Sequence, residues 1–328
     1  MSTKIIAIVG ITGNQGASVA DVFLDEPGWK IRGISRDPSK PSSKEWSNQG
    51  VEMVAGNLDD VESMKKAFKG ANVIFGNTDF WQHMQNPANH ERAEKEGRTP
   101  NEVAYDCEVE QGKKLVDAVA VNIDTLDRFV LSTLSDTKKW SNGKITFNLH
   151  FDAKWQAVEY LKEKYPELAK KTSFLQLGVF ASNWKGGMPV PKKQEDGSYV
   201  VSLPMAGDAK FPMVDPRTDT GSFTKALVEI APGKILVGAG SKMSWDDWCQ
   251  IWGKINGVSC RFERSDRKFM DENMVPFGRE LADMFQYIDE FGYDGSDPSV
   301  VYPWDLGVDV KVTTVEEYLK KQDWSSVL

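Results

Sequence analysis

The sequence has few cysteines and histidines and no long apolar run. Its 328 residues include three cysteines, Cys107, Cys249 and Cys260, without a CxxC spacing, and only three histidines. Such a small, odd and scattered set predicts neither a disulfide framework nor a zinc site, and it favours a reducing compartment, either cytoplasmic or nuclear. The apolar run IIAIV ends at Gly10 after five residues, and no other run approaches membrane-spanning length. We therefore expect neither a signal peptide nor a membrane anchor.

Basic residues are outnumbered, and common catalytic motifs are missing. Lys and Arg number 40 against 48 Asp and Glu, which gives a formal net charge of -8 at pH 7. That field repels phosphate backbones and anionic lipid, so we expect no direct nucleic-acid binding and no membrane association. The motifs HExxH, GxSxG and GxxxxGKS/T do not occur. His83 and His90 are predicted to be solvated loop histidines rather than a metal pair, so we expect no metal site.

Short β-branched runs alternate with amphipathic segments in the first half of the chain. Six strands are expected, at residues 5–9 and in the runs that begin at Lys30, Val51, Asn72, Arg128 and Ser173. The segments between them include DVESMKKAFKG, EVEQGKKLVDAVAV and HFDAKWQAVEYLKEK, which carry apolar residues at helical spacing. This alternation predicts an α/β protein with a Rossmann-type, doubly wound parallel sheet.

The composition of the sequence changes after Trp184. The Gly- and Pro-rich segment KGGMPVPKKQEDG is followed by a hairpin-like SYVVSLP. Further helices are predicted to begin near Asp219, Ser244 and Phe277, and SWDD has the form of a capping box.

We therefore expect two domains, a dinucleotide-binding Rossmann domain at 1–183 and a smaller α+β cap domain at 184–328, some segments of which return to the Rossmann sheet. Trp245, Trp248 and Trp252 recur at helical spacing and are predicted to form part of the cap's core. Open α/β sheets bind ligands at their carboxyl edge, so the cap would supply the substrate or partner side of a cleft there.

Three glycines join the first predicted strand to the helix after it. Gly10 permits a tight turn, Gly13 lets a pyrophosphate approach the main chain, and Gly16 lets the helix pack closely on the strand. A plain strand-to-helix turn is the alternative, because a GxxGxxG trio is a weak signal by itself. A second strand near Lys30 favours the dinucleotide site. Its predicted ligands are Gly10, Thr12, Gly13, Asn14, Gln15 and Gly16.

The residues that follow the second predicted strand are basic. No acidic residue stands directly at its tip to accept a ribose 2′-hydroxyl, whereas Arg36 and Lys40 suit a 2′-phosphate. A guanidinium can bind that phosphate bidentately while it stacks on adenine, which predicts NADP(H) rather than NAD(H). A solvated surface charge is the alternative for Arg36.

Taken with later segments, these motifs resemble the NmrA-like family of atypical short-chain dehydrogenases, in particular its fungal members and the mammalian NmrA-like redox sensor. The similar segments, in family order, are GITGNQGASV, SRDPSK, GNLDD, TDFW, EVEQGKKLVDA, HFDAK, LGVFASNW, VDPRTDTG, FMDENMVPFGRELADMFQYI and TTVEEYLKKQDW. The resemblance spans nearly the whole chain and implies NADP(H) binding. The further cofactor contacts that it implies are Asn57, Leu58, Asp79, Phe80, Lys154, Gly178, Val179 and Phe180.

One segment departs from the mammalian sensor. Between Trp81 and Glu108 the chain is longer and more polar. We expect residues 82–107 to form a loop that shapes a substrate or partner surface.

The candidate catalytic residues are Lys154 and His150. Ordinary short-chain dehydrogenases use a Tyr four residues before a Lys, and in HFDAK a His occupies the Tyr position. Residues at i and i+4 share one helix face, so both could point into the cleft. Alternatively, Lys154 only binds ribose or faces solvent, and His150 is structural or covers the cofactor. Ser132, Thr133 and Ser135 could replace the usual catalytic Ser, but such residues are also common in turns.

Two functions remain open. The first is an NADP(H)-dependent oxidoreductase that acts on a small carbonyl or enone-type metabolite, with Lys154 nearest the chemistry. The second, implied by the missing Tyr and by the resemblance to regulatory members, is a non-catalytic redox sensor that controls a transcription factor or another protein partner. The sequence leaves the substrate, the partner and the oligomeric state open, with a homodimer among the options.

Overall fold

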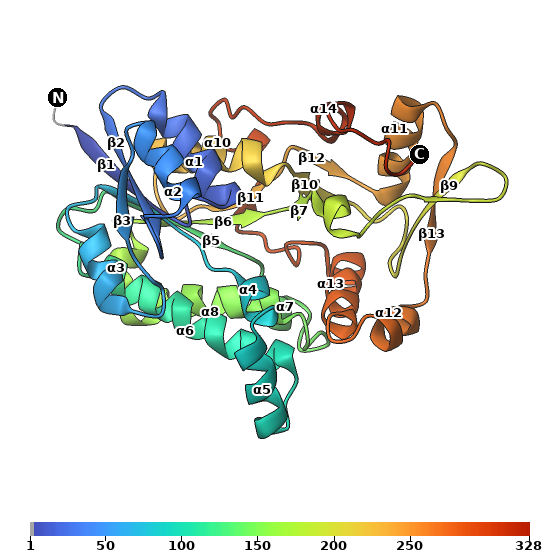
Figure 1. The fold of residues 1–328 in the computed structure, drawn as a ribbon, viewed down its shortest axis with the longest axis horizontal. Helices are drawn as coiled ribbons and strands as arrows, with labels where there is room; N and C mark the ends of the chain where they lie inside the picture. Colours follow the sequence, from blue (N-terminus) through green and yellow to red (C-terminus); the bar gives the residue numbers. More distant parts are fainter. Residues whose placement is uncertain (1–2) are drawn as a thin grey trace.

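The structure, a computed structural model that describes residues 3–328, is built around one eight-stranded sheet. In order across the sheet the strands are β3 (Glu52–Ala55), β2 (Trp29–Ser35), β1 (Lys4–Val9), β4 (Val73–Gly76), β5 (Arg128–Thr133), β6 (Thr172–Leu177), β11 (Ile235–Gly238) and β14 (Val300–Val301). Every neighbouring pair is parallel. The chain winds outward from β1 to β3 and then resumes at β4 on the other side of β1 (Figure 1). Ligands of such sheets bind at this reversal, outside the carboxyl ends of the strands.

The predicted doubly wound parallel sheet is confirmed. All six expected strands form, and in β1 both faces are covered, because Ala7 and Ile8, whose side chains point to opposite faces, are each 0% exposed. The sequence analysis did not identify β11 and β14, which follow residue 183 and extend the sheet beyond β6. With two residues, β14 is too short to show a pattern of its own, and β11 lies beyond Trp184, where the regular alternation of the sequence ends.

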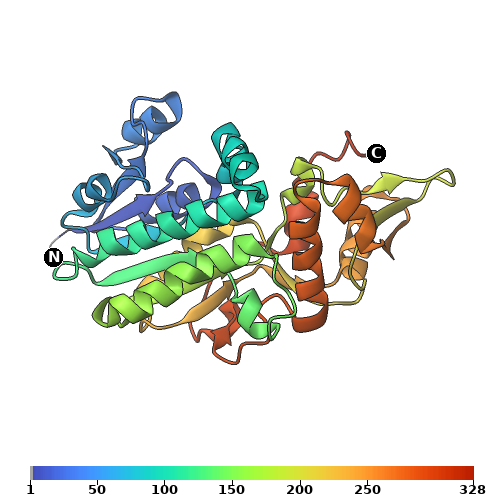
Figure 2. The ribbon, with the colours of Figure 1, turned by 90° about the horizontal axis from the view of Figure 1, so that it is seen from below.

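Helices cover both faces of the sheet. One face carries α1 (Asn14–Leu24), α2 (Pro41–Asn48) and α10 (Pro216–Glu229), and the other carries α3 (Val61–Phe68), α6 (Pro100–Ala120) and α8 (Leu149–Lys164) (Figure 1). Figure 2 shows α6 and α8 side by side along the sheet. They approach closely at Gly112, where an added Cβ would lie 2.8 Å from the Ala157 Cβ. The short helices α7 (Thr137–Trp140) and α9 (Pro166–Ala169) lie at the two ends of α8.

The other elements form a smaller α+β region beyond the carboxyl end of β6. It holds two three-stranded sheets, β12-β10-β7 and β13-β9-β8. Their strands are β7 (Val179–Phe180), β8 (Lys192–Lys193), β9 (Tyr199–Leu203), β10 (Phe211–Val214), β12 (Ser241–Met243) and β13 (Cys260–Arg264). The helices are α11 (Trp245–Asn256), α12 (Arg267–Asn273), α13 (Gly278–Phe291) and α14 (Val315–Lys320), with 3-10 turns η1 (Asn183–Gly186) and η2 (Pro303–Asp305).

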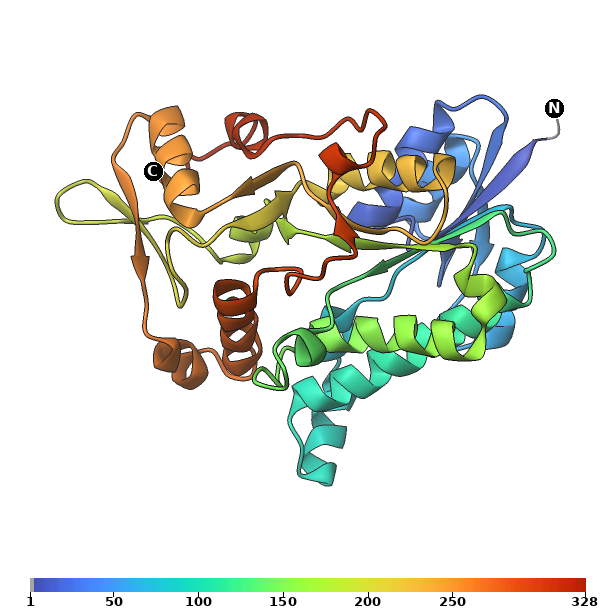
Figure 3. The same ribbon diagram turned by 180° about the vertical axis from the view of Figure 1, so that it is seen from behind.

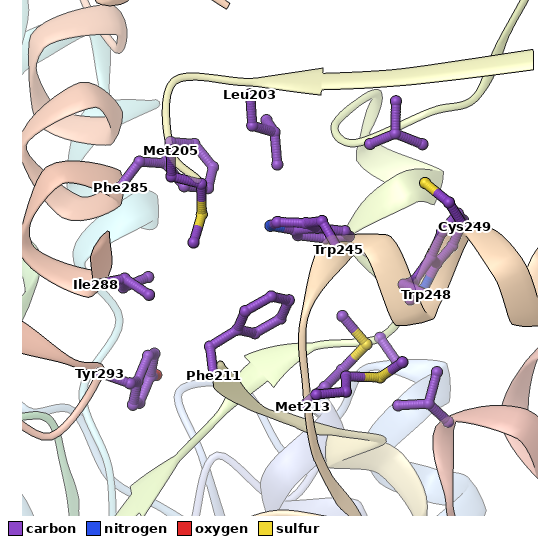
Figure 4. Close-up of a cluster of buried hydrophobic side chains, with 14 of the residues drawn as sticks. Leu203, Met205, Phe211, Met213, Trp245, Trp248, Cys249, Phe285, Ile288 and Tyr293 are labelled. Atoms are coloured by element: carbon purple, nitrogen blue, oxygen red, sulfur yellow. The ribbon is translucent and has the colours of Figure 1, made fainter. Parts of the chain in front are cut away.

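The α11 tryptophans are core residues, as predicted. Trp245, Trp248 and Trp252 are 2%, 2% and 0% exposed. The first two lie among side chains from β9, β10 and α13 (Figure 4). The predicted capping box also forms, because the Asp247 N–H donates to the Ser244 hydroxyl and the Ser244 N–H donates to the Asp247 carboxylate.

Residues 82–107 are helical, so the predicted polar loop is wrong. They form most of α4 (Phe80–Met84), all of α5 (Pro87–Glu96) and the start of α6. Pro87 and Pro100 occupy the first turns, and the side chains of Asn86 and Thr99 accept hydrogen bonds from the helix-start N–H groups. These helices begin at local capping signals rather than at an apolar stripe, which is why the polar composition was misleading.

The two histidines of this segment are also not solvated loop residues. His83 on α4 is 8% exposed, and its Nε2 lies 3.1 Å from Gln111 Oε1. His90 on α5 has its Nε2 2.7 Å from the Met84 carbonyl oxygen. Across residues 3–328 no group of three or more His, Cys, Asp and Glu could hold a metal ion. In that same range, no helix is long and apolar enough to cross a membrane.

The C-terminal segment is fastened to α10. Figure 3 shows it running above α10 towards the smaller region. Asp219 of α10 accepts hydrogen bonds from the Thr313 N–H at 3.0 Å and from the Thr313 hydroxyl at 2.8 Å. Burial raises the pKa of the Asp219 carboxyl to about 6, because the bonds from Thr313 offset only part of the desolvation.

Candidate functional site

The glycine stretch forms a tight passage from β1 into α1. Gly10 has a φ of +65°, a conformation that favours glycine. A Cβ on Gly16 would lie 2.4 Å from the Gly10 carbonyl oxygen, so a side chain there would push the helix off the strand. Gly13 is exposed, and a Cβ on it would meet only the Gly10 carbonyl oxygen, at 3.4 Å. The main chain at Gly13 is therefore open to a ligand.

The first turn of α1 has no side-chain cap, which it shares with α2 and α8. Its N-cap is Gly13, which offers no acceptor. By contrast, Asp60 caps α3, Asp79 caps α4 and Asp215 caps α10, each through its own carboxylate. The first N–H groups of α1, together with the positive end of the helix, are thus available to an anion at the carboxyl end of β1.

Gln15 is fixed to the neighbouring part of the sheet. The Ser132 hydroxyl at the end of β5 donates to Gln15 Oε1 at 2.8 Å. Thr133 and Ser135 face other partners, since the Thr133 hydroxyl donates to the Leu134 carbonyl and the Ser135 hydroxyl lies 2.7 Å from the Tyr287 hydroxyl. Of these three residues at the end of β5, Ser132 is the one linked to the glycine passage. Thr12 and Asn14 of the passage are exposed.

Arg36 lies at the end of β2 with its charge uncompensated. The side chain is exposed, and its Nη1 donates to Gln82 Oε1 of α4 at 3.3 Å. The adjacent Asp37 is turned towards Ser39, whose hydroxyl and N–H donate to its Oδ1 and lower the pKa of the Asp37 carboxyl. Lys40 is exposed at the N-cap of α2. Two cations therefore border the end of β2.

The loop after β3 contacts α6 near the end of β2. Asn57 Oδ1 accepts from the Asp59 N–H, and Leu58 packs on the core under α3 and α6. The Gln111 amide donates to Asp59 Oδ1 at 2.8 Å, while the Gln111 oxygen faces Gln82 and His83 of α4. The sequence analysis assigned no role to either glutamine, although Gln111 lies in the segment EVEQGKKLVDA.

The side chains of Asp79 and Phe80 stabilise α4, the first as its N-cap and the second by packing. The Asp79 carboxylate accepts from the Trp81 N–H at 3.0 Å and from the Gln82 N–H at 3.4 Å. Phe80 is 1% exposed and packs with Met84. Any contact that these two residues make with a bound cofactor would therefore come chiefly from the main chain.

Lys154 of α8 reaches the end of β4. Its Nζ donates to the Thr78 carbonyl at 3.0 Å, to the Thr78 hydroxyl at 3.3 Å and to Glu108 Oε1 of α6. The Thr78 hydroxyl also donates to Glu108 Oε1, at 2.7 Å. The Lys154 side chain is 15% exposed and that of Glu108 is 0% exposed. The second oxygen, Glu108 Oε2, is buried without a hydrogen-bond partner. Sequence reasoning had assigned Glu108 no role.

His150 lies one turn before Lys154 but faces α13. Its Nδ1 is 2.7 Å from Glu280 Oε1, and its backbone N–H donates to the same oxygen at 2.8 Å. The ring is 6% exposed and lies 5.1 Å, between centroids, from the Trp81 ring. Trp81 also lies 6.2 Å from the ring of Phe277. Glu280 thus supplies the side-chain cap that α8 lacks, from a position 130 residues away that no local motif reveals.

The residues after β6 are engaged by the smaller region. A Cβ on Gly178 would lie 2.7 Å from the Pro212 carbonyl oxygen. Val179 and Phe180 form β7, which pairs with Met213 and Val214 of β10. Both side chains remain half-buried. The strand end predicted to lie beside the nicotinamide is therefore rigidly placed.

An open hollow of about 690 Å³ lies on the other side of α8. It is lined by Asp136, Asp152 and Glu159, among others, and by none of the predicted site residues. Helical spacing places Asp152 and Glu159 opposite His150 and Lys154. Burial raises the pKa of the Asp152 carboxyl to about 7. This hollow therefore does not include the candidate site at the carboxyl ends of β1 and β4.

The chain matches the NmrA-like family over residues 2–319. The NmrA-like family domain-containing oxidoreductase FrzB of Cladobotryum sp is 25% identical over 341 residues, covering 95% of this chain and 91% of the relative. The similarly named hkm9 of Aspergillus hancockii is 25% identical over 319 residues, covering 91% of this chain and 87% of the relative.

Solved structures share the fold. NmrA, described as a negative transcriptional regulator and solved in complex with NADP, has a TM-score of 0.69 at 18% identity, covering 98% of this chain and 95% of its own. The leucoanthocyanidin reductase–NADPH complex from Vitis vinifera has a TM-score of 0.65 at 17% identity, covering 96% and 98%. With a family match across almost its whole length, this chain belongs to the NmrA-like family.

Proposed function

We propose that the chain is an NADP(H)-dependent oxidoreductase that reduces a small carbonyl or enone-type metabolite. The observation that carries the proposal is the uncapped first turn of α1, which lies at the reversal of strand order with the uncompensated Arg36 at the end of the next strand. Fungal relatives named as oxidoreductases and the NADP(H) complexes of structural neighbours support it.

The residues present fit a dinucleotide with a 2′-phosphate. Open main chain at Gly13 and free N–H groups in the first turn of α1 would hold the diphosphate. Arg36 and Lys40 would hold the 2′-phosphate, since no carboxylate neutralises Arg36 in the described part of the chain. Bound NADPH would supply a hydride to the substrate. The chain itself must then supply the proton and the place for the substrate.

Lys154 is the proposed source of that proton. It stands at the end of β4, where Glu108 and Thr78 hold its ammonium in one position. The carbonyl oxygen of the substrate would accept a proton from Nζ and form a new O–H bond, while the carbonyl carbon would accept the hydride. A fixed, partly desolvated ammonium suits such a transfer because little reorganisation is needed.

The surroundings of Lys154 suit an apolar or aromatic substrate. Between centroids, the Trp81 ring lies 5.1 Å from the His150 ring and 6.2 Å from the Phe277 ring, and Trp81 and Phe277 are only half-buried. His150 is held by Glu280, so its proposed role is structural, as part of this aromatic wall.

Single-turnover absorbance measurements at the NADPH band test the proposal. The protein with bound NADPH is mixed with a panel of carbonyls and enones, and we expect at least one compound to oxidise the cofactor. Lys154→Ala should lower that rate by about 10² or more, whereas Lys164→Ala, an exposed change on the same helix, should not alter it. Failure of every compound, or a rate unchanged in Lys154→Ala, would refute the proposed activity.

A non-catalytic redox sensor is the second candidate. It is favoured by the three hydrogen bonds that engage the Lys154 ammonium with protein acceptors, and by the regulatory neighbour NmrA. A sensor must adopt different states with NADP⁺ and NADPH, because a ligand that prefers neither state shifts nothing. Hydrogen exchange would then differ between the two forms over the elements that change conformation. Identical exchange and identical partner capture in both forms would eliminate this candidate.

A further inference from the structure

We infer that Gln82 is a specificity-determining residue for NADP(H) over NAD(H), because it presents the Arg36 guanidinium without neutralising it. The inference rests on the proposed function, since it assumes that Arg36 receives a 2′-phosphate. The proposed phosphate-binding residues follow β2, whereas Gln82 lies in α4, which follows β4. Gln82 stands 46 positions after Arg36 in the chain.

Arg36 depends on Gln82 for its placement. Within residues 3–328 the guanidinium forms no ion pair, and its hydrogen bond to Gln82 Oε1, at 3.3 Å, is the only one that its side chain makes. Asp37 is occupied by Ser39. An arginine on an exposed strand end otherwise samples many rotamers, and ordering it on binding costs affinity. A partner already present in the free protein reduces that cost.

The Gln82 carboxamide is oriented by a second glutamine. Its nitrogen donates to Gln111 Oε1 at 3.5 Å, so its oxygen points towards Arg36. Gln111 is 4% exposed and is itself fixed, because its amide donates to Asp59 and its oxygen faces His83 Nε2. The two glutamines therefore connect the end of β2 to the loop after β3 through α4 and α6.

The neutrality of Gln82 matters as much as its position. A carboxylate at this place would bind Arg36 through a charge-assisted bond and would compete with a 2′-phosphate for it. It would also repel the phosphate directly. An amide orients the guanidinium and leaves the full positive charge for the ligand. NAD(H), which lacks the 2′-phosphate, gains nothing from this arrangement, so its affinity should be insensitive to residue 82.

Calorimetric titration of three variants with NADP⁺ and with NAD⁺ tests the inference. Gln82→Glu has nearly the same shape as the native residue and should weaken NADP⁺ binding by about tenfold or more, with NAD⁺ binding changed by less than about twofold. Gln82→Met removes the acceptor without adding charge and should weaken NADP⁺ binding by about threefold. Gln85→Glu, an exposed change at the C-terminal end of the same helix, is the matched control and should leave both affinities unchanged.

The NAD⁺ titration also reports whether each variant is folded. The inference is overturned if Gln82→Glu keeps the NADP⁺ to NAD⁺ ratio of the unaltered protein, or if Gln85→Glu loses as much NADP⁺ affinity as Gln82→Glu. In either case the proposed NADP(H) site would still stand. If the unaltered protein bound neither dinucleotide, the proposed function and the inference would fall together.

Discussion

Two cations mark the ends of the candidate cleft, and the protein treats them in opposite ways. Arg36, at the proposed adenosine end, is exposed and has a neutral partner in Gln82. Lys154, at the proposed nicotinamide end, is 15% exposed and is bound by the fully buried Glu108 and by Thr78. The first cation is available to a ligand, whereas the second is already paired.

The difference indicates that the two cations have different roles. A charge that recognises phosphate must remain unpaired until the ligand arrives, and water keeps it stable meanwhile. A charge on a side chain that is only 15% exposed has lost most of its water, so it needs an opposite charge to remain there. We therefore expect changes at Arg36 to alter ligand affinity and changes around Lys154 to alter the stability of the fold.

The largest effect should come from removing Glu108. Glu108→Ala leaves the Lys154 ammonium partly buried without its carboxylate, and we expect the free energy of unfolding to fall by about 3 kcal/mol. Urea denaturation measures it. The control is Glu110→Ala, which removes the exposed pair with Lys114 on the same helix and should cost less than about 0.5 kcal/mol. Equal costs for the two variants would remove the contrast between buried and exposed pairs.

Removing Arg36 should come next. Arg36→Ala deletes the charge-assisted contact to a 2′-phosphate and should weaken NADP⁺ binding by about 30-fold, which corresponds to about 2 kcal/mol. Its stability should change little, because the side chain is exposed. Fluorescence or calorimetric titration measures the affinity. A variant that binds NADP⁺ as tightly as the unaltered protein would contradict the phosphate-binding role.

Asp152, on the opposite face of α8 from Lys154, sharpens the comparison because it is a half-buried carboxyl without an ion pair among the described residues. Burial raises the pKa of its carboxyl to about 7, whereas in the unfolded chain it titrates near pH 4. Between those values the folded state holds the extra proton, so this group lowers stability as the pH rises towards 7.

Asp152→Asn should abolish that loss. We expect the variant to be more stable than the unaltered protein by about 1 to 2 kcal/mol at pH 8 and equally stable near pH 4. Thermal unfolding at both pH values measures the difference. A stabilisation of the same size at both would show that ionisation of Asp152 is not its cause.

The smallest effect should come from breaking the hydrogen bond between β5 and α1. Ser132→Ala removes the hydroxyl that donates to Gln15 Oε1, a single hydrogen bond between neutral groups. We expect a loss of about 1 kcal/mol in unfolding free energy and a change in NADP⁺ affinity below about threefold. A tenfold loss of affinity would instead give Ser132 a direct role in cofactor binding.

The parts of the fold that the sequence predicted are those with strong local patterns. The strand β1 is a continuous apolar run, the strands β2 to β6 are short runs that alternate with amphipathic segments, and the α11 capping box is a four-residue signal. The helices α5 and α6 were misassigned at residues 82–107 because their polar composition hid the capping residues Asn86 and Thr99. Composition was thus a poorer guide there than the individual helix-start residues.

The residues of the candidate site also fall into those with a local sequence signal and those without one. Gly10, Gly16 and Arg36 follow from a strand-to-helix motif and from the end of the next strand, both of which are local. Glu108 and Glu280 become partners of Lys154 and His150 only through the packing of α6 and α13 against α8, across 46 and 130 positions. Pairings over such separations leave no periodic trace in one sequence, so the structure was needed to find them.

The most direct test of the account is a pair of calorimetric titrations of the unaltered protein, one with NADP⁺ and one with NAD⁺. If the first turn of α1 holds a diphosphate and Arg36 holds a 2′-phosphate, NADP⁺ should give a saturable heat with an affinity at least about tenfold above that of NAD⁺. Saturable binding of neither dinucleotide, or equal affinity for both, would contradict the central claim.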